Sequence, residues 1–252
     1  MAVDYDLSDR RILVIGASSG VGREVGLAAS RAGASVAFAA RRRDQLEAAV
    51  ALAKGPAAAI ACDVGDDAQC ARAVVDAARA LGGLDALVYA AGMSPLAMLA
   101  DADRESWRRV LDVNVIGASQ ITAAALPHLR ERQGHAVYVS SYAVRQALPG
   151  LGLYRVSKLA LDGLIECWRM EHPDVDFTRV VVGNTSGTEF ANAWGPDAIR
   201  GAMDVWVSRN LFPAATMMPL DVLAEAVLSV IAVRGYVDDI AVMPRTRDPR
   251  AG

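Results

Sequence analysis

Short apolar runs alternate with segments of helical periodicity along most of the chain. The run from Arg11 to Ile15 stops at a glycine, and apolar residues then recur at the spacing of one helix face. The alternation predicts strands over Arg11–Ile15, Ser35–Ala40, Ala57–Cys62, Leu84–Tyr89, His135–Ser140, Phe177–Val182 and Asp238–Met243. It predicts helices over Gly20–Ala32, Asp44–Lys54, Asp67–Leu81, Asp103–Arg132, Gly152–His172 and Pro219–Val233. Pro127 should bend or end the fourth of these helices locally.

Strands that alternate with helices of this length indicate βαβ units and a doubly wound, parallel α/β sheet of about seven strands. The strands are almost continuously apolar, as expected where helices cover both faces of a sheet. No linker, charge block or repeat divides residues 1–252, so we expect a single domain.

Residues 189–218 break the alternation and are rich in aromatic and methionine side chains. These are Phe190, Trp194, Met203, Trp206, Phe212, Met217 and Met218. A long connection with little regular pattern is typical of a lid over a binding site. An interface between copies of the chain is the alternative interpretation.

Composition excludes several classes of function. The 26 basic and 29 acidic residues give a net charge of −3, which leaves no basic field for a nucleic acid. The chain has no run of 18 apolar residues and no signal-like N-terminus, so we expect no membrane span and a cytoplasmic location. Three scattered cysteines and three scattered histidines show neither disulfide nor metal spacing, so no metal site is expected.

A glycine-rich turn follows the first predicted strand. Its sequence is Gly16-Ala17-Ser18-Ser19-Gly20-Val21-Gly22, and a helix comes directly after it. Glycines at such a turn allow a close backbone approach, and the helix N-terminus offers free N–H groups to a pyrophosphate. The spacing is GxxxGxG and not the common GxGxxG, yet its place between strand and helix favours dinucleotide binding.

The residues after the second strand indicate which dinucleotide binds. A site for NAD places a carboxylate there for the ribose hydroxyls. This chain has Arg41, Arg42 and Arg43, and its first acidic residue is Asp44. Because guanidinium groups bind phosphate through paired, charge-assisted hydrogen bonds, we expect NADP(H).

Tyr154 and Lys158 lie one turn apart at the start of a predicted helix. Lys158 is one of only two lysines in the chain, so its place in a YxxxK motif is informative. A phenol is a weak acid at neutral pH, and a nearby ammonium group should lower its pKa.

With these motifs the chain resembles the short-chain dehydrogenase/reductase family over nearly its whole length. The resemblance implies a Rossmann-like fold and an NADP-preferring oxidoreductase. It implies four catalytic residues, namely Asn114, Ser141, Tyr154 and Lys158. The residues expected to contact the cofactor are Gly16, Ser18, Ser19, Gly20, Val21, Gly22, Arg41, Arg42, Asp63, Val64, Ala91, Gly92, Tyr154, Lys158 and Thr188.

Two positions depart from the family's pattern. Tyr89-Ala90 stands where the family usually has two asparagines, and Gly183-Asn184 where it often has Pro-Gly. The first change removes two amides that brace the centre of the sheet, so Tyr89 must be accommodated differently. The second makes the backbone route to Thr188 uncertain.

The implied reaction is hydride transfer between the nicotinamide and a carbonyl or secondary alcohol carbon of a rather apolar small molecule. Tyr154 would donate the proton, Ser141 would bind the substrate oxygen, and Lys158 would bind the nicotinamide ribose. Asn114 would hold a water that connects Lys158 to solvent. Relatives assemble through two long helices, which implies a homotetramer or homodimer. The alternatives are an NADP-binding scaffold or sensor without turnover, and a cofactor-dependent epimerisation or elimination.

Overall fold

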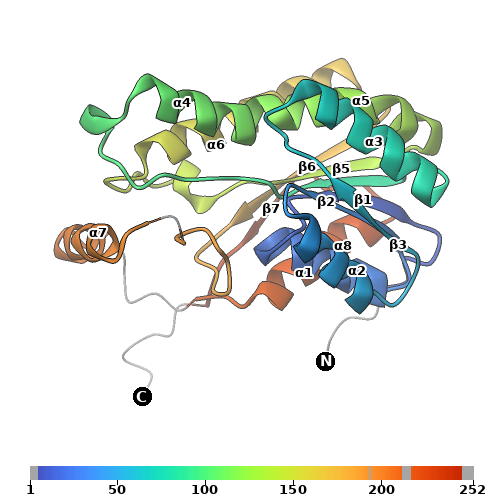
Figure 1. Cartoon of the computed structure of the whole chain (residues 1–252), viewed down its shortest axis with the longest axis horizontal. Coiled ribbons are helices and arrows are strands. Elements are labelled where there is room, and N and C mark those ends of the chain that lie inside the picture. Colours follow the sequence, from blue (N-terminus) through green and yellow to red (C-terminus); the bar gives the residue numbers. More distant parts are fainter. Residues whose placement is uncertain (1–4, 193, 212–216, 246–252) are drawn as a thin grey trace.

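Seven parallel strands form one sheet between two layers of helices (Figure 1). The computed structural model describes residues 5–192, 194–211 and 217–245. The strand order is β3-β2-β1-β4-β5-β6-β7. The strands are β1 (Arg11–Ile15), β2 (Ser35–Ala40), β3 (Ala57–Ala61), β4 (Ala86–Tyr89), β5 (His135–Val139), β6 (Asp176–Val182) and β7 (Asp239–Val242). The doubly wound sheet expected from the apolar runs is therefore confirmed.

Helices cover both faces of the sheet, as Figure 1 shows. One layer holds α3 (Asp67–Leu81), α4 (Arg104–Leu111), α5 (Gly117–Arg132) and α6 (Gly152–Glu171). The other holds α1 (Gly20–Arg31), α2 (Arg43–Leu52) and α8 (Leu220–Ala232), while α7 (Pro196–Ser208) lies to one side. Each layer encloses its own cluster of buried apolar side chains, since the strands are apolar on both faces.

The strand order reverses between β1 and β4, which are direct neighbours in the sheet. Ile15 at the end of β1 pairs with Tyr89 at the end of β4. In an open parallel sheet, ligands bind outside the carboxyl ends of the strands at such a reversal. The glycine turn follows β1, so the topology puts it at this point.

The long helix after β4 is irregular at another place than Pro127, where the sequence predicted a bend or an end. It continues through Pro127, and the wider π-helical turn lies earlier, at Asp112–Ile116. Ala123 and Pro127 both face solvent, so water can bind the carbonyl that loses its N–H partner. The helix therefore does not end at Pro127, which rules out one of the two expected effects of this residue.

The region 189–218 is more regular than its sequence suggests, because it contains α7. Pro196 starts this helix, a position that tolerates proline. Trp206 in the last part of α7 is buried and donates its indole N–H to the Pro149 carbonyl at 2.9 Å. Phe212 lies outside the described residues.

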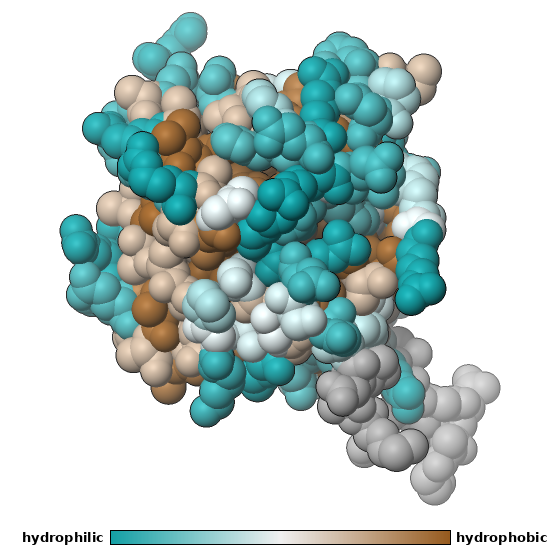
Figure 2. Space-filling view, turned by 90° about the vertical axis from the view of Figure 1, so that its right-hand side faces the viewer, coloured by the Kyte–Doolittle hydropathy of each residue, from teal (hydrophilic) through white to brown (hydrophobic). Residues whose placement is uncertain are grey.

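Within the described residues, one continuous helical stretch, Arg104–Arg132, is long and apolar enough to cross a membrane. In the fold 44% of its apolar window is buried against other parts of the chain. Elsewhere on the molecule apolar side chains also reach the surface, and Figure 2 shows apolar residues gathered along one side of the face that it presents.

Gly26 sets how closely α1 approaches the sheet. A methyl group at this position would lie 2.4 Å from the ring of Phe38, which is fully buried on β2. We expect Gly26→Ala to destabilise the protein by about 1–3 kcal/mol, because neither the ring nor the backbone can yield cheaply. Urea denaturation measures the change.

Gly201→Ala is the matched control, since a methyl group there meets no atom within 4 Å. It lies in the exposed part of α7 and should be neutral or stabilise by up to about 1 kcal/mol. Wild-type stability in Gly26→Ala would contradict the close packing of α1 on β2.

Candidate active site

The glycine turn brings three segments of backbone together. Gly16 has a φ of +84°, and a methyl group on it would lie 2.6 Å from the Ala91 nitrogen. A methyl group on Gly22 would lie 2.5 Å from the Gly16 carbonyl oxygen. Only glycine satisfies these contacts, so the turn, the start of α1 and the segment after β4 pack backbone against backbone.

The N-terminus of α1 is arranged to receive an anion. Ser19 precedes the helix without capping it through its side chain, and the first turn, which contains Val21, has no acidic residue. The free N–H groups and the positive end of the helix dipole therefore face outward above the turn.

The hydroxyls of Ser18 and Ser19 lie beside the Arg42 guanidinium. Arg42 Nη2 donates to Ser18 Oγ at 2.9 Å and to Ser19 Oγ at 2.8 Å. Arg41 is exposed on the same loop, and we find no ion pair or side-chain hydrogen bond for it within the described ranges. The two predicted arginines thus stand at the edge of the turn, where they can meet phosphate oxygens.

The predicted contacts beyond the turn lie along the same edge. Asp63 and Val64 follow β3, where the Asp63 carboxylate accepts the Gly65 N–H at 3.0 Å. Thr188 reaches the turn in spite of the altered sequence after β6. A methyl group on Gly20 would lie 3.6 Å from the Thr188 Cα. The predicted contacts thus lie along one edge of the sheet, where they could hold an extended dinucleotide with its phosphates over the turn.

Tyr154, Ser141 and Lys158 come together at the other end of this edge. The Ser141 hydroxyl lies beside the Tyr154 phenol and acts to lower its pKa. Lys158 Nζ lies 5.9 Å from the Tyr154 ring centroid and donates to the Val139 carbonyl at 2.7 Å. Both Tyr154 and Lys158 are on the first turns of α6 and both are buried.

The ionisation of this pair differs from the expectation. Burial raises the pKa of Tyr154 to about 12, although the Ser141 hydrogen bond opposes the shift. Burial also lowers the pKa of Lys158 to about 8, with the Asp162 carboxylate opposing. The expected lowering of the tyrosine pKa by Lys158 is not found in this structure, because burial dominates the shift and Lys158 is not among the described groups that act on this phenol. The ring of Phe190, 4.9 Å from that of Tyr154, contributes to this burial.

Asn114 braces the backbone next to the lysine. It is fully buried in the π-helical turn, accepts the Met93 N–H at 2.8 Å and donates to the Met93 carbonyl at 2.9 Å. Its amide also donates to Ser157 Oγ at 2.8 Å. A methyl group on Gly92 would lie 3.6 Å from both Asn114 Oδ1 and Lys158 Nζ, so these three residues meet.

Tyr89 supplies a brace where the sequence lacks the usual amides. Its side chain is fully buried and its hydroxyl donates to the Val113 carbonyl at 2.5 Å. Burial raises the pKa of this phenol well above its ordinary value, so it remains a donor. The bond fixes the π-helical turn one residue before Asn114.

Three contributors to this site were not singled out by the sequence. Ser157 accepts from Asn114 and donates to the Tyr154 carbonyl at 2.8 Å. Its position one turn from Tyr154 is a signal that could have indicated this contact. Glu189 contacts the glycine turn, and no sequence pattern around Glu189 predicts that contact. Phe190 was assigned to a lid, but its packing on Tyr154 depends on the fold.

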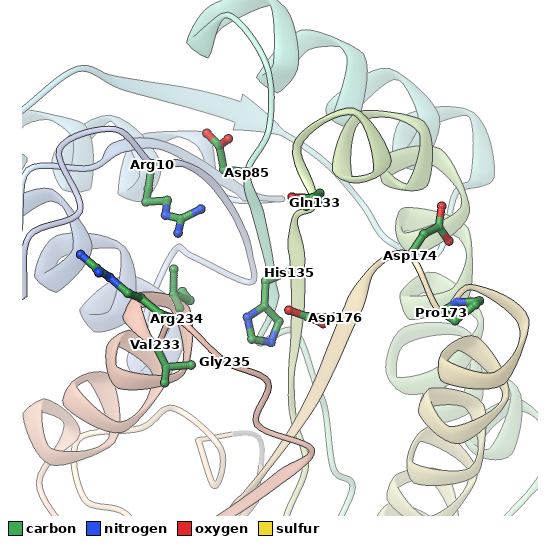
Figure 3. Close-up of a pocket in the computed structure, with 11 residues that line it drawn as sticks. Arg10, Asp85, Gln133, His135, Pro173, Asp174, Asp176, Val233, Arg234 and Gly235 are labelled. Atoms are coloured by element: carbon green, nitrogen blue, oxygen red, sulfur yellow. The ribbon is translucent and has the colours of Figure 1, made fainter.

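A separate cavity of about 430 Å³ opens at the opposite edge of the sheet (Figure 3). It is lined by Arg10, Asp85, His135, Asp176 and Arg234, which lie at or near the amino ends of strands or after α8. His135 is buried and bonded through Nε2 to Thr178 at 2.7 Å. The cavity shares no residue with the cluster around Tyr154.

Comparison with known proteins agrees with this geometry. A family model described as short chain dehydrogenase matches residues 10–198. The chain belongs to the short-chain dehydrogenase family. This match places the chain in a family of oxidoreductases and confirms the resemblance seen in the sequence.

Curated relatives of this short-chain dehydrogenase differ in length and name. Glycine betaine reductase ATRR of Emericella nidulans is 36% identical over 200 residues, which are 77% of this chain and 16% of that protein. The 11-beta-hydroxysteroid dehydrogenase-like 3 of Arabidopsis thaliana is 34% identical over 69% of this chain and 59% of its own. The chain thus spans a sixth to about three fifths of these two relatives.

A solved structure extends the match to nearly the whole chain. The short-chain dehydrogenase from Streptomyces avermitilis superimposes with a TM-score of 0.79 at 28% identity. The match covers 92% of this chain and 88% of that one. The fold described above is therefore that of the family.

The buried lysine predicts a dependence of stability on pH. Because the pKa of Lys158 is about 8 in the folded chain and 10.5 when exposed, only the unfolded chain keeps this proton between those values. Stability should therefore rise with pH in this window by about 1 kcal/mol per pH unit relative to Lys158→Met. Urea denaturation without cofactor, from pH 7 to 9.5, measures the difference.

Lys54→Met removes the other lysine, which is exposed, and is the control. Its stability should run parallel to that of the wild type over the same range. Parallel curves for Lys158→Met as well would contradict the desolvation of Lys158.

Proposed function

We propose that this short-chain dehydrogenase transfers hydride between NADP(H) and a carbonyl or secondary alcohol carbon of an apolar small molecule. The proposal rests above all on the Tyr154 phenol, which lies beside Ser141 and one turn from Lys158 at the sheet edge that carries the glycine turn. When bound, the cofactor supplies or accepts the hydride. The chain positions the two partners and moves the proton.

Each polar group has a task that its position supports. The Tyr154 hydroxyl gives its proton to the substrate oxygen in reduction and takes it back in oxidation. Ser141, which lies beside that phenol, binds the same oxygen as charge develops on it. The Lys158 ammonium stabilises the Tyr154 phenolate during proton transfer, once water or substrate replaces the Phe190 ring that packs on Tyr154. Asn114 holds the Met93 backbone and, through Ser157, the first turn of α6.

The aromatic residues beside Tyr154 support an apolar substrate. Phe190 packs against the Tyr154 ring, and Trp194 packs against Phe190 at 5.2 Å between ring centroids. A substrate that reaches the phenol must replace this contact, so an apolar ketone loses less on leaving water than a polar one. The name of the Arabidopsis relative, a hydroxysteroid dehydrogenase-like protein, makes steroid ketones a first choice to test.

Tyr154→Phe tests the catalytic role. The loss of the proton donor should lower kcat by at least about 100-fold, while Kd for NADPH changes less than about twofold. Decay of NADPH absorbance over a panel of ketones, with a separate fluorescence titration, gives both values. Tyr138→Phe is the control, because it removes another buried phenol, bonded to Thr122 on α5. Undiminished turnover in Tyr154→Phe would refute the role.

Arg41→Ala tests the cofactor. We expect Kd for NADPH to rise roughly tenfold or more and Kd for NADH to change less than about twofold, since a guanidinium on a phosphate contributes a charge-assisted bond. Arg43→Ala is the control, because Arg43 pairs with Glu47 on the exposed face of α2. An equal loss for both cofactors would remove the preference for NADP(H).

A scaffold that binds NADP(H) without turnover is the second candidate. The packing of Phe190 on Tyr154 and the raised pKa of Tyr154 favour this candidate, because both make the phenol a poorer proton donor. NADPH binding without absorbance decay across the panel would support the scaffold. Turnover that depends on Tyr154 excludes it.

A further inference from the structure

A carboxylate from the region after β6 lies against the glycine turn. Glu189 Oε2 is 2.7 Å from Arg42 Nη2 and accepts the Ser19 hydroxyl at 2.8 Å. Both bonds hold the pKa of Glu189 below its ordinary value, so it is ionised at neutral pH. A negative charge of the chain itself therefore stands at the N-terminus of α1.

This carboxylate bonds the groups that are proposed to bind the cofactor. Ser19 and Arg42 each contact Glu189, and Arg42 is also the partner of Ser18. A phosphate oxygen and the Glu189 carboxylate cannot share these donors without strong like-charge repulsion. Cofactor binding therefore has to separate Glu189 from Arg42 or Ser19.

The same segment extends from the turn to the catalytic phenol. We call residues 188–192 together with Trp194 the strap. Thr188 lies over Gly20, Glu189 binds Arg42, and Phe190 packs on Tyr154. Trp194 closes the far side by donating to the Ser94 carbonyl at 2.7 Å.

The residues just before the strap are anchored by backbone hydrogen bonds, and a glycine lies between them and the strap. Met218 accepts the Ser186 N–H and donates its own N–H to the Asn184 carbonyl, both at 2.9 Å. Gly187 follows directly, with a φ of +76°. Gly187 therefore separates Glu189 from the anchored residues Asn184 and Ser186.

We propose that Glu189 is an internal occupant of the phosphate site and that it holds the strap over Tyr154 until the cofactor displaces it. The proposal rests on the proposed function, since it takes the cofactor to be a dinucleotide at this turn. When phosphates take Arg42 and Ser19, Glu189 leaves, and the adjacent Phe190 leaves Tyr154 with it. The cofactor must therefore bind before the carbonyl substrate.

The bond is suited to displacement because it is only partly buried. The side chains of Arg42 and Glu189 remain 44% and 41% exposed. An ion pair in such a position changes an equilibrium by a few-fold at most. A dinucleotide, which gains several charge-assisted bonds and the contacts of its rings, overcomes it readily.

Glu189→Gln tests the occupancy, because it removes the charge and keeps the size of the side chain. We expect Kd for NADPH and Kd for NADH both to fall by roughly threefold in fluorescence titrations without substrate. Glu47→Gln, which breaks the neighbouring pair with Arg43, should leave both constants at wild-type values. Unchanged or weaker cofactor binding in Glu189→Gln would overturn the proposal.

The two cofactors separate this proposal from the proposed function. If the chain prefers NADH, the function assigned above fails, yet Glu189→Gln still tightens both cofactors relative to the wild type. If NADPH is preferred and Glu189→Gln tightens neither, the function stands and the proposal falls.

Movement of the strap needs its own measurement. Acrylamide quenching of the wild type, compared with Trp194→Phe, isolates the fluorescence of Trp194. We expect Trp194 to become more accessible on addition of NADPH, and in Glu189→Gln before any addition. Quenching of Trp194 that does not change in either case would overturn the coupling between Glu189 and the strap.

Discussion

The close contact between Gly16 and Ala91 is the constraint on which the site depends. It lets the turn after β1 lie directly against the segment after β4, where the strand order reverses. The N-terminus of α1 then stands over the gap between these strands, and Gly92 next to it meets Lys158 and Asn114. One backbone contact thus fixes the distance between the anion site and the reacting groups. Any side chain at Gly16 would separate the two.

In the layer that contains α5, polar side chains bind backbone groups that the irregular helix leaves without partners. The π-helical turn at Asp112–Ile116 widens the helix and frees backbone groups inside the core. Buried groups of this kind need partners. Tyr89 binds the Val113 carbonyl, and Asn114 on the same turn binds both polar groups of Met93. Tyr89, which stands where the family usually has an asparagine, therefore supplies one of the partners that this turn needs.

The sequence was sufficient for the fold and for bringing Tyr154, Ser141 and Lys158 into one hypothesis, because both depend on local patterns. Apolar runs between glycines gave the strands, and the spacing of Tyr154 and Lys158 placed them on one helix face. The charge states of Tyr154 and Lys158 could not be predicted from the sequence. They depend on burial, to which Phe190 from a distant segment contributes. The pair of Arg42 with Glu189 joins two segments that only the folded sheet brings together. The π-helical turn was missed because its residues keep the periodicity of an ordinary helix.

Burial acts on Tyr154 and Lys158 in the same direction, since it disfavours charge on both. It holds the phenol protonated and pushes the ammonium toward its neutral form, which weakens the attraction on which proton transfer relies. Exposure of Tyr154 reverses both effects at once, because water or a polar substrate oxygen stabilises phenolate and ammonium alike. If Glu189 holds Phe190 in place, the arrival of phosphates at Arg42 also prepares the acid at the other end of the strap. Tyr154 would then become able to transfer its proton only when the hydride donor is bound.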